Sequence, residues 1–263
     1  MALDLLFPLL SGRDARHLAL KDLAQVCSQT SEPVLLLGEL CMATDLWAQL
    51  CAVSTLQHYS LKPNEGVLGE SQLWSSLRAL MESQAAVLYL TGFSQLDPIL
   101  KASLLDWLQT QAAAKKIILQ SDSVPVAALQ ELSFYKRCRV LQLVPLKSRL
   151  GDLGEITAAL LQTYNQRYAK TVKILQPQLL AWLQVYDWPG DLMELDSLMR
   201  DLVLRSDAEI LRESDLSLAA TQLRGPLDFR EASMLKILKE SASVEVVERF
   251  LGCEEGSLRR KLS

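Results

Sequence analysis

Apolar residues in this chain follow two patterns, short continuous runs and longer stretches with helical spacing. A short apolar run bounded by proline or glycine is typical of a buried strand, whereas apolar residues three and four apart indicate one face of a helix. The two patterns alternate over the first 150 residues. Strands are predicted at 34–37, 85–90, 117–119 and 140–144, and helices at 14–29, 46–56, 73–81 and 100–111.

Buried strands that alternate with amphipathic helices indicate an α/β fold, in which a parallel sheet is covered by helices on both faces. After about residue 150 only the helical pattern continues. Helices are predicted at 152–168, 176–186, 192–205 and 213–222. Residues 224–226 are a plausible linker, and 228–263 is predicted to form a compact helical module.

Composition supports a folded protein and narrows its partners. The 263 residues are 49% hydrophobic and 22% charged, which is enough apolar material for a core and argues against disorder. The formal net charge is −4, so the chain as a whole does not attract nucleic acid. Any contact with DNA therefore has to be local.

The cysteines, histidines and apolar segments predict a cytoplasmic protein without a metal. Five cysteines at irregular spacings indicate reduced thiols, and the two histidines, His17 and His58, lack a partner at metal-ligand spacing. No apolar run reaches the length of a membrane span, so no membrane partner is expected. The short apolar start is interrupted by Asp4 and has no basic segment before it, so a signal peptide is not expected either.

Several short sequence words occur in the order found in the sigma-54-dependent enhancer-binding activators. These words lie at 34–39, 100–109, 143–153 and 187–195, and the last of them, D-W-P-G followed by E-L, resembles that family's W-P-G-N-x-R-E-L. The chain end, 251–262, resembles a Fis-type helix-turn-helix. The resemblance implies an AAA+ P-loop-like parallel sheet with helices on both faces at 1–150, a helical lid at 151–223 and a small all-α helix-turn-helix at 227–263.

The phosphate loop of that family reads G-E-S-G-T-G-K-E, and the aligned residues here, 38–45, read G-E-L-C-M-A-T-D. Gly38 and Glu39 are retained, Cys41 and Ala43 replace glycines, and Thr44 replaces the lysine. Glycines let backbone N–H groups close around phosphate, and the lysine neutralises phosphate charge. The resemblance therefore implies a degenerate phosphate loop.

The other nucleotide-contacting positions of the family also differ. Thr91 and Gly92 stand where the family has an acidic pair that holds the metal and orients water. Asp122 and Met193 stand at the two sensor positions, and the loop that contacts the sigma factor has no counterpart between 57 and 84. From these differences we expect no catalytic residue and no cofactor, and we predict that the chain is not an enzyme.

The C-terminal module is predicted to place a recognition helix at 254–262. Ser257, Arg259, Arg260 and Lys261 supply hydrogen-bond donors for DNA. However, Glu254 and Glu255 begin that helix, and 227–263 holds seven Lys/Arg against seven Asp/Glu. A DNA-binding module and a helical cap or dimerisation unit both fit this balance.

Two functional hypotheses follow. In the first, the chain is a non-hydrolysing AAA+-like transcriptional regulator that binds DNA through its C-terminal module. In the second, it is a protein-interaction module that binds another regulator of the same fold, or another partner, without contacting DNA. Self-association through the AAA+-like or the C-terminal module is expected in either case, and an ATP-dependent sigma-54 activator is a distant third hypothesis.

Overall fold

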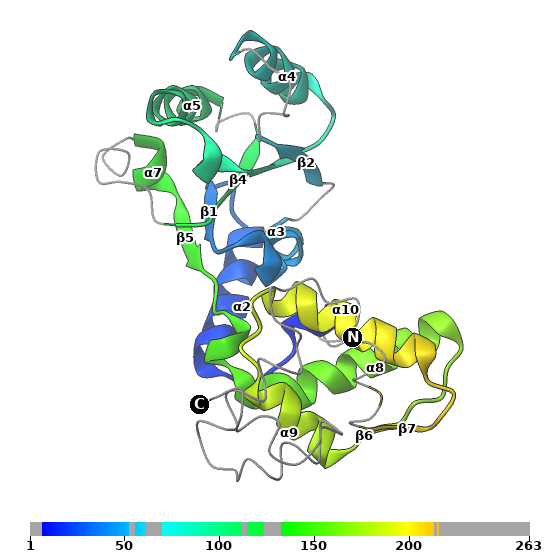
Figure 1. Cartoon of the computed structure of the whole chain (residues 1–263). Helices are drawn as coiled ribbons and strands as arrows, with labels where there is room; N and C mark the ends of the chain where they lie inside the picture. The colour runs from blue at the N-terminus through cyan, green and yellow to red at the C-terminus, as the bar shows by residue number, and fades with distance from the viewer. Residues whose placement is uncertain are drawn as a thin grey trace, which may run out of the picture. The chain divides into compact units, whose positions relative to one another are not determined.

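The computed structural model describes residues 7–52, 56–61, 70–111, 115–123, 133–212 and 215. The chain divides into two compact units, residues 13–148 and residues 1–12 with 149–263 (Figure 1). The predicted helix-turn-helix at 227–263 and nearly all of the predicted helix at 213–222 lie outside the described residues.

The unit formed by residues 13–148 is built on a five-stranded sheet in the order β2-β3-β4-β1-β5, and every neighbouring pair is parallel. The central strand β1 pairs on both sides, with Leu35 opposite Leu119 of β4 and Val140 of β5. The predicted parallel sheet is thereby confirmed. The strands are β1 Val34–Leu37, β2 Leu56–Ser60, β3 Val87–Thr91, β4 Lys116–Ser121 and β5 Arg139–Gln142.

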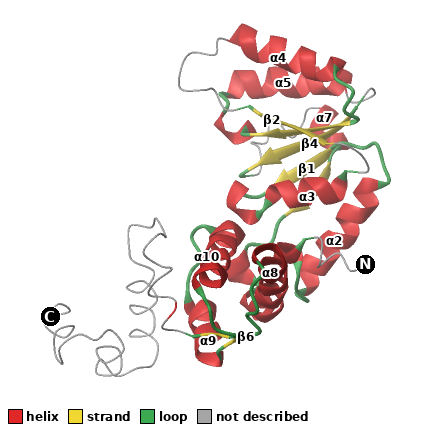
Figure 2. Ribbon diagram, turned by 90° about the vertical axis from the view of Figure 1, so that its right-hand side faces the viewer, coloured by secondary structure: helices red, strands yellow, loops and turns green. Residues whose placement is uncertain are grey.

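Helices cover both faces of this sheet, as predicted (Figure 2). Residues Leu35 and Leu88 point into a core shared with α4 Glu70–Glu82 and α5 Pro98–Gln111. Alternate strand residues point to the opposite face, where α2 Ala15–Ser28 and α3 Thr44–Cys51 pack. The short helix α7 Ser133–Arg137 contributes Phe134 to the core that α4 and α5 cover.

One predicted element is wrong. The sequence pattern predicts a helix over 46–56, but α3 ends at Cys51 and Leu56 begins the strand β2. This strand lies at the edge of the sheet, and its residues are only partly buried or exposed. Because Gln57, His58 and Ser60 face an incompletely covered edge, the strand lacks the continuous apolar run that marks the central strands.

The second unit is mainly helical, as predicted. Its helices are α8 Leu153–Tyr168, α9 Pro177–Val185 and α10 Asp191–Arg205. A parallel pair of two-residue strands, β6 Ile174–Leu175 and β7 Ile210–Leu211, was not expected from the sequence. The 3-10 helix η1 Pro8–Leu10 also belongs to this unit and packs against α8. Within the ranges described above, no helix has the length and apolarity needed to cross a bilayer.

A buried ion pair attaches η1 to the start of the helical unit. The Arg149 guanidinium donates to the backbone carbonyls of Ser11 (2.9 Å) and Leu9 (3.2 Å). Asp152 lies 3.6 Å from the same guanidinium. At Gly12 (φ 132°), a Cβ would collide with the Asp152 carboxylate at 2.3 Å, so the chain passes Asp152 only with glycine at this position.

Leu88 tests the assignment of the central strands. It is fully buried in β3, so Leu88→Ala should lower the free energy of unfolding by about 2–5 kcal/mol, measured by chemical denaturation. Ile99→Ala is the matched control because the Ile99 side chain on α5 is 80% exposed, and its effect should stay within about 0.5 kcal/mol. Equal effects of the two substitutions would contradict the strand assignment.

Candidate functional site

The carboxyl ends of β1, β3 and β4 meet at one edge of the sheet, where ligands bind in open α/β folds. Gln120, near the end of β4, joins the three ends through its side-chain amide. Its Nε2 donates to the carbonyl of Gly38 (2.8 Å), and its Oε1 accepts from the N–H of Gly92 (3.3 Å). The structure therefore brings the predicted phosphate-loop position Gly38 and the predicted acidic-pair position Gly92 together around one buried side chain.

The connection from β1 to α3 is a 3-10 turn, η2 Leu40–Met42, followed by Ala43 in the left-handed region at φ 56°. A residue with a Cβ is strained in that region, where glycine is favoured. Met42 and Ala43 are buried, whereas Leu40 is 39% exposed. The sulfur of Met42 would lie 3.0 Å from a Cβ at Gly38, so a side chain occupies the space beside the first loop glycine.

Cys41 and Glu39 lie on the outer side of the same turn. The thiol of Cys41 donates to a carboxylate oxygen of Glu39 at 3.5 Å. Glu39 is exposed and Cys41 is half-buried. A phosphate approaching this turn would therefore meet a carboxylate at its rim.

Behind the turn, Thr44 is buried at the first position of α3. Its hydroxyl accepts a hydrogen bond of 2.9 Å from the Tyr89 hydroxyl of β3. Burial raises the pKa of Tyr89 above its ordinary range, which keeps the phenol protonated as a donor. Thr44, at the position of the family's lysine, therefore ties α3 to the centre of the sheet.

His58 extends this network to the edge strand. Its ring stacks on Tyr89 with the ring centroids 5.0 Å apart, and its Nε2 lies 2.9 Å from the hydroxyl of Thr91. Thr91, one of the two acidic-pair positions, thus has a histidine partner. Sequence reasoning missed His58 because an isolated histidine carries no motif, and its place opposite Tyr89 follows only from the pairing of β2 with β3.

Asp122 follows β4 and is exposed, but hydrogen bonds to neighbouring residues fix its position. Its carboxylate accepts from Gln120 Nε2 (2.8 Å), and its N–H donates to the hydroxyl of Ser94 (2.7 Å). Lys101 of α5 donates to the carbonyl of Ser94 (2.8 Å), which places a cation beside this group. Sequence reasoning did not single out Lys101, Ser94 or Gln120. Ser94 and Gln120 also bond to groups 28 to 82 positions away, which no local pattern reports.

The other sensor position, Met193, lies in the helical unit and is 45% exposed on α10. Its neighbours in the D-W-P-G word have a clear structural role. The carboxylate of Glu194 accepts from the N–H of Gly190 (2.8 Å) and from the Tyr186 hydroxyl (2.9 Å). The indole N–H of Trp188 donates to the carbonyl of Leu183 at 2.9 Å. This word therefore caps α10 and joins it to α9.

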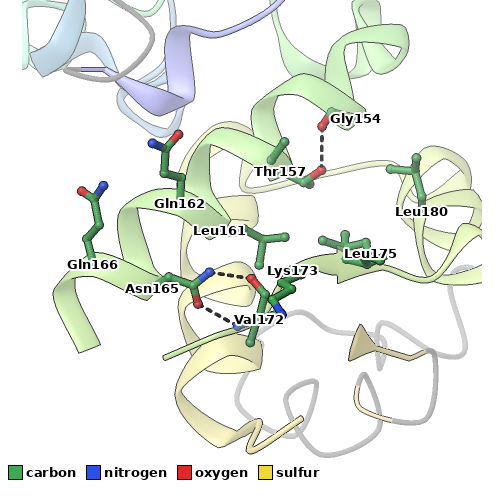
Figure 3. A pocket seen from close by; sticks show the side chains of 12 residues that line it. Gly154, Thr157, Leu161, Gln162, Asn165, Gln166, Val172, Lys173, Leu175 and Leu180 are labelled. Carbon is green, nitrogen blue, oxygen red and sulfur yellow. Dashed lines mark hydrogen bonds between the residues drawn. The ribbon is translucent and has the colours of Figure 1, made fainter. Parts of the chain in front are cut away.

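A pocket of about 520 Å³ lies along α8 and the strand β6 (Figure 3). Amide and ammonium side chains, including Gln162, Gln166 and Lys173, line it beside apolar ones. The Asn165 amide in its wall is bonded to both backbone groups of Val172, so it fixes the connection between α8 and β6.

In the part of the chain that the structure describes, no cluster of three metal-ligating side chains is present. The predicted DNA contacts Ser257, Arg259, Arg260 and Lys261 lie outside that part.

The hydrogen bond between Tyr89 and Thr44 should stabilise the site. Tyr89→Phe removes a buried donor, so the free energy of unfolding should fall by about 1–2 kcal/mol. Tyr59→Phe on the neighbouring strand β2 is the control, because the Tyr59 ring packs against the apolar core and phenylalanine preserves that packing. Denaturant titration of both variants checks this, and a loss no greater for Tyr89→Phe than for Tyr59→Phe would contradict it.

The Glu194 cap gives a second stability test. Glu194→Ala leaves the N–H of Gly190 and the hydroxyl of Tyr186 without this acceptor, and we expect a loss of about 1–2 kcal/mol in thermal or chemical unfolding. Met193→Ala changes the preceding, exposed residue and should have a much smaller effect. If the two variants unfold alike, the capping role is wrong.

Comparison with known proteins agrees with this architecture. A family model described as the AAA+ ATPase lid domain matches residues 147–226. The chain is 25% identical over 158 residues to the transcriptional regulatory protein ZraR of Klebsiella oxytoca, which covers 54% of this chain and 36% of ZraR. It is 28% identical over 88 residues to the Sigma54-dependent transcriptional regulator SfnR of Pseudomonas fluorescens, covering 34% and 24%. The chain thus matches little more than a third of the length of ZraR, and less of SfnR.

Two solved structures show the same fold. NtrX from Brucella abortus in complex with ADP superposes with a TM-score of 0.63 at 16% identity, covering 96% of this chain and 68% of NtrX. RuvB of Thermotoga maritima gives 0.52 at 15% identity, covering 95% and 88%. The predicted α/β fold of AAA+ type is confirmed.

These comparisons correct one prediction. The substituted loop and acidic-pair positions led us to predict that the chain is not an enzyme, but the matching lid model is that of AAA+ ATPases and the structural neighbours have the AAA+ fold. The chain carries an AAA+ lid domain and is homologous to sigma-54-dependent transcriptional regulators.

Proposed function

We propose that this chain is a transcriptional regulator of the AAA+ type, acting in the cytoplasm, that contacts DNA through its C-terminal segment 227–263. The observation that carries the proposal is its similarity to transcriptional regulators over more than half of the chain, together with the lid match at 147–226. The resemblance of 251–262 to a Fis-type helix-turn-helix supports the proposed DNA contact.

The residues that the chain shares with the family support the proposal, because they stabilise the helical unit. The word at 143–153 contains Arg149 and Asp152, whose buried ion pair holds η1. The word at 187–195 contains Glu194, which bonds the N–H of Gly190 at the start of α10 and the Tyr186 hydroxyl after α9, and Trp188, which bonds a carbonyl of α9. The two words therefore preserve the packing of the helical unit, which is the part of the chain that precedes the proposed DNA-binding segment.

The chemistry of the C-terminal segment restricts how it would contact DNA. Arg259, Arg260 and Lys261 are three consecutive cations, and Ser257 adds a hydroxyl, so phosphate and base contacts are expected on this stretch. The opposing charges of Glu254 and Glu255 weaken the attraction. Binding should therefore be modest and strongly dependent on salt.

The charge balance of the segment favours one alternative. Seven Lys/Arg against seven Asp/Glu leave 227–263 without net charge, which suits a surface that binds protein. In this alternative the segment mediates self-association or binds a second regulator of the same fold.

The first test measures DNA binding by the full chain across a range of salt concentrations, with fluorescence anisotropy as the readout. A triple variant, in which alanine replaces each of Arg259, Arg260 and Lys261, should bind all DNA sequences more weakly. It should also flatten the plot of log affinity against log salt by about one unit for each phosphate contact removed. Replacing Arg230, Lys236 and Lys239 removes the same charge from the same segment and is the matched control.

The converse variant separates the two functions. Glu254→Ser combined with Glu255→Arg should strengthen binding by removing carboxylates near the phosphates. If neither the parent nor this variant binds DNA at low salt, the DNA contact is wrong. Concentration-dependent association measured by sedimentation, lost on deleting 227–263, would then identify the interaction module.

A further inference from the structure

The pocket along α8 and β6 is lined entirely by residues of the helical unit (Figure 3). One wall is a face of α8, on which the lining residues recur three and four positions apart from Gly154 to Gln166. The opposite wall is the chain from Val172 to Leu175, and Leu180 of α9 lies near Gly154. The pocket is therefore a groove between a helix and a short strand.

The polar groups in the walls of the pocket are already bonded within the chain. The Thr157 hydroxyl donates to the carbonyl of Leu153 (2.7 Å), and the Asn165 amide makes the two backbone bonds described above. The Lys173 ammonium lies 2.7 Å from a carboxylate oxygen of Glu209. An occupant that needs a counter-charge or many hydrogen bonds is poorly served here, so the pocket favours an apolar occupant.

The most buried lining residues are apolar, and the wall formed by α8 has small residues. Leu161 and Val172 are 5% and 3% exposed. At Gly154, the nearest atom to an added Cβ would be a methyl carbon of Leu180 at 4.0 Å, and Ala158, one turn later, is exposed. Because these two residues carry almost no side chain, another segment of chain can approach the backbone of α8 closely.

The apolar surface continues from the pocket onto the ribbon β6–β7. Ile174 pairs with Ile210, so the two side chains lie next to each other on one face of the ribbon. They are 54% and 40% exposed, whereas Leu211 on the other face is fully buried. Ile174 also lines the pocket. The surface formed by the pocket, Ile174 and Ile210 is thus continuous and ends two residues before Arg212.

The chain begins a helix directly after β7. The N–H of Asp215 donates to the carbonyl of Arg212 (3.0 Å), and the Asp215 carboxylate accepts from the N–H of Arg212 (2.8 Å). A side chain that reaches back three residues to a backbone N–H is characteristic of a helix start, and Asp215 is itself helical. These bonds agree with the start of the helix predicted at 213–222.

The sequence that follows has an apolar face of the required kind. Leu216, Ala219, Ala220 and Leu223 recur three and four positions apart. The match to the lid family extends through residue 226 and so includes this segment.

We propose that the segment 216–223 of this chain packs its apolar face into the pocket and against Ile174 and Ile210. The segment starts beside its site, because β7 pairs directly with β6, whose residues line the pocket. As a helix, 216–223 is about 12 Å long, and the lining stretch of α8 from Gly154 to Gln166 is about 18 Å long, so the segment fits the pocket.

The covalent connection favours this occupant over a separate molecule. A segment tethered a few residues from its site has an effective concentration in the millimolar range, which a second copy or a free peptide has to exceed. The contact also goes beyond the proposed DNA binding, because it holds whatever partner 227–263 has. Residues 224–226 follow the packed segment directly, so the C-terminal segment would begin at a fixed place on the helical unit.

A photo-crosslinking amino acid in place of Ala158 tests the contact in the intact chain. After irradiation, peptide mapping by mass spectrometry should find position 158 linked to 216–223 of the same chain. The same group in place of Leu204 is the control, since Leu204 is 42% exposed on α10 but does not line the pocket, and it should not reach that segment. Linkage of position 158 to a second chain, seen as a covalent dimer, or to other segments only, overturns the proposal.

Amide hydrogen exchange tests the contact without a bulky probe. Ile174→Asp places a charge in the proposed contact, so the amides of 216–223 should exchange faster by about tenfold, the effect of losing the burial of one apolar side chain. Leu204→Asp makes an equivalent change elsewhere on the helical unit and should leave these amides unchanged. Circular dichroism checks that both variants are folded.

The parent chain alone also decides the matter. If its amides at 216–223 exchange as fast as those of an unfolded peptide, or exactly as they do in Ile174→Asp, the segment does not occupy the pocket. Neither experiment contains DNA, so the result is independent of whether 227–263 binds DNA.

Discussion

The parallel pairing of β1 with a strand on each side is the constraint on which the α/β unit depends. Each of its backbone groups is satisfied by β4 or β5, so the strand is buried on both faces and has to be apolar. Parallel pairing also places the carboxyl ends of all the strands at the same edge of the sheet. That edge is where Gln120, Thr44, Thr91 and Asp122 lie, although they come from three separate segments of the chain.

How much could be predicted from the sequence depended on where each element lies. The central strands were found because burial on both faces leaves an apolar run, and the long helices because one face is buried. The edge strand β2 was missed since His58 and Ser60 are exposed, and the pair β6–β7 is too short to leave any pattern. At the site, resemblance located the backbone positions, but not their partners. The bond from Tyr89 to Thr44 joins residues 45 apart, and no local pattern reports such a contact.

The residues retained from the family words and those that differ have separate physical roles. Arg149, Trp188 and Glu194 bond backbone groups in the helical unit, and Asp152 pairs with Arg149, so a change there leaves buried polar atoms without partners. At the strand ends, by contrast, a neutral hydroxyl pair joins β3 to α3, and a neutral amide joins β4 to the residue after β1.

The short pair β6–β7 has a consequence for how the helical unit forms. It joins residues 174 and 210, which are 36 positions apart, and so closes a loop that contains both α9 and α10. Closing such a loop costs chain entropy that four paired residues cannot repay alone, so the pair forms only when the enclosed helices are already packed. Fraying of these two strands should therefore report on the cooperativity of the whole unit. Amide hydrogen exchange at Gln176, whose N–H donates to the carbonyl of Leu211, would measure how readily this pair opens.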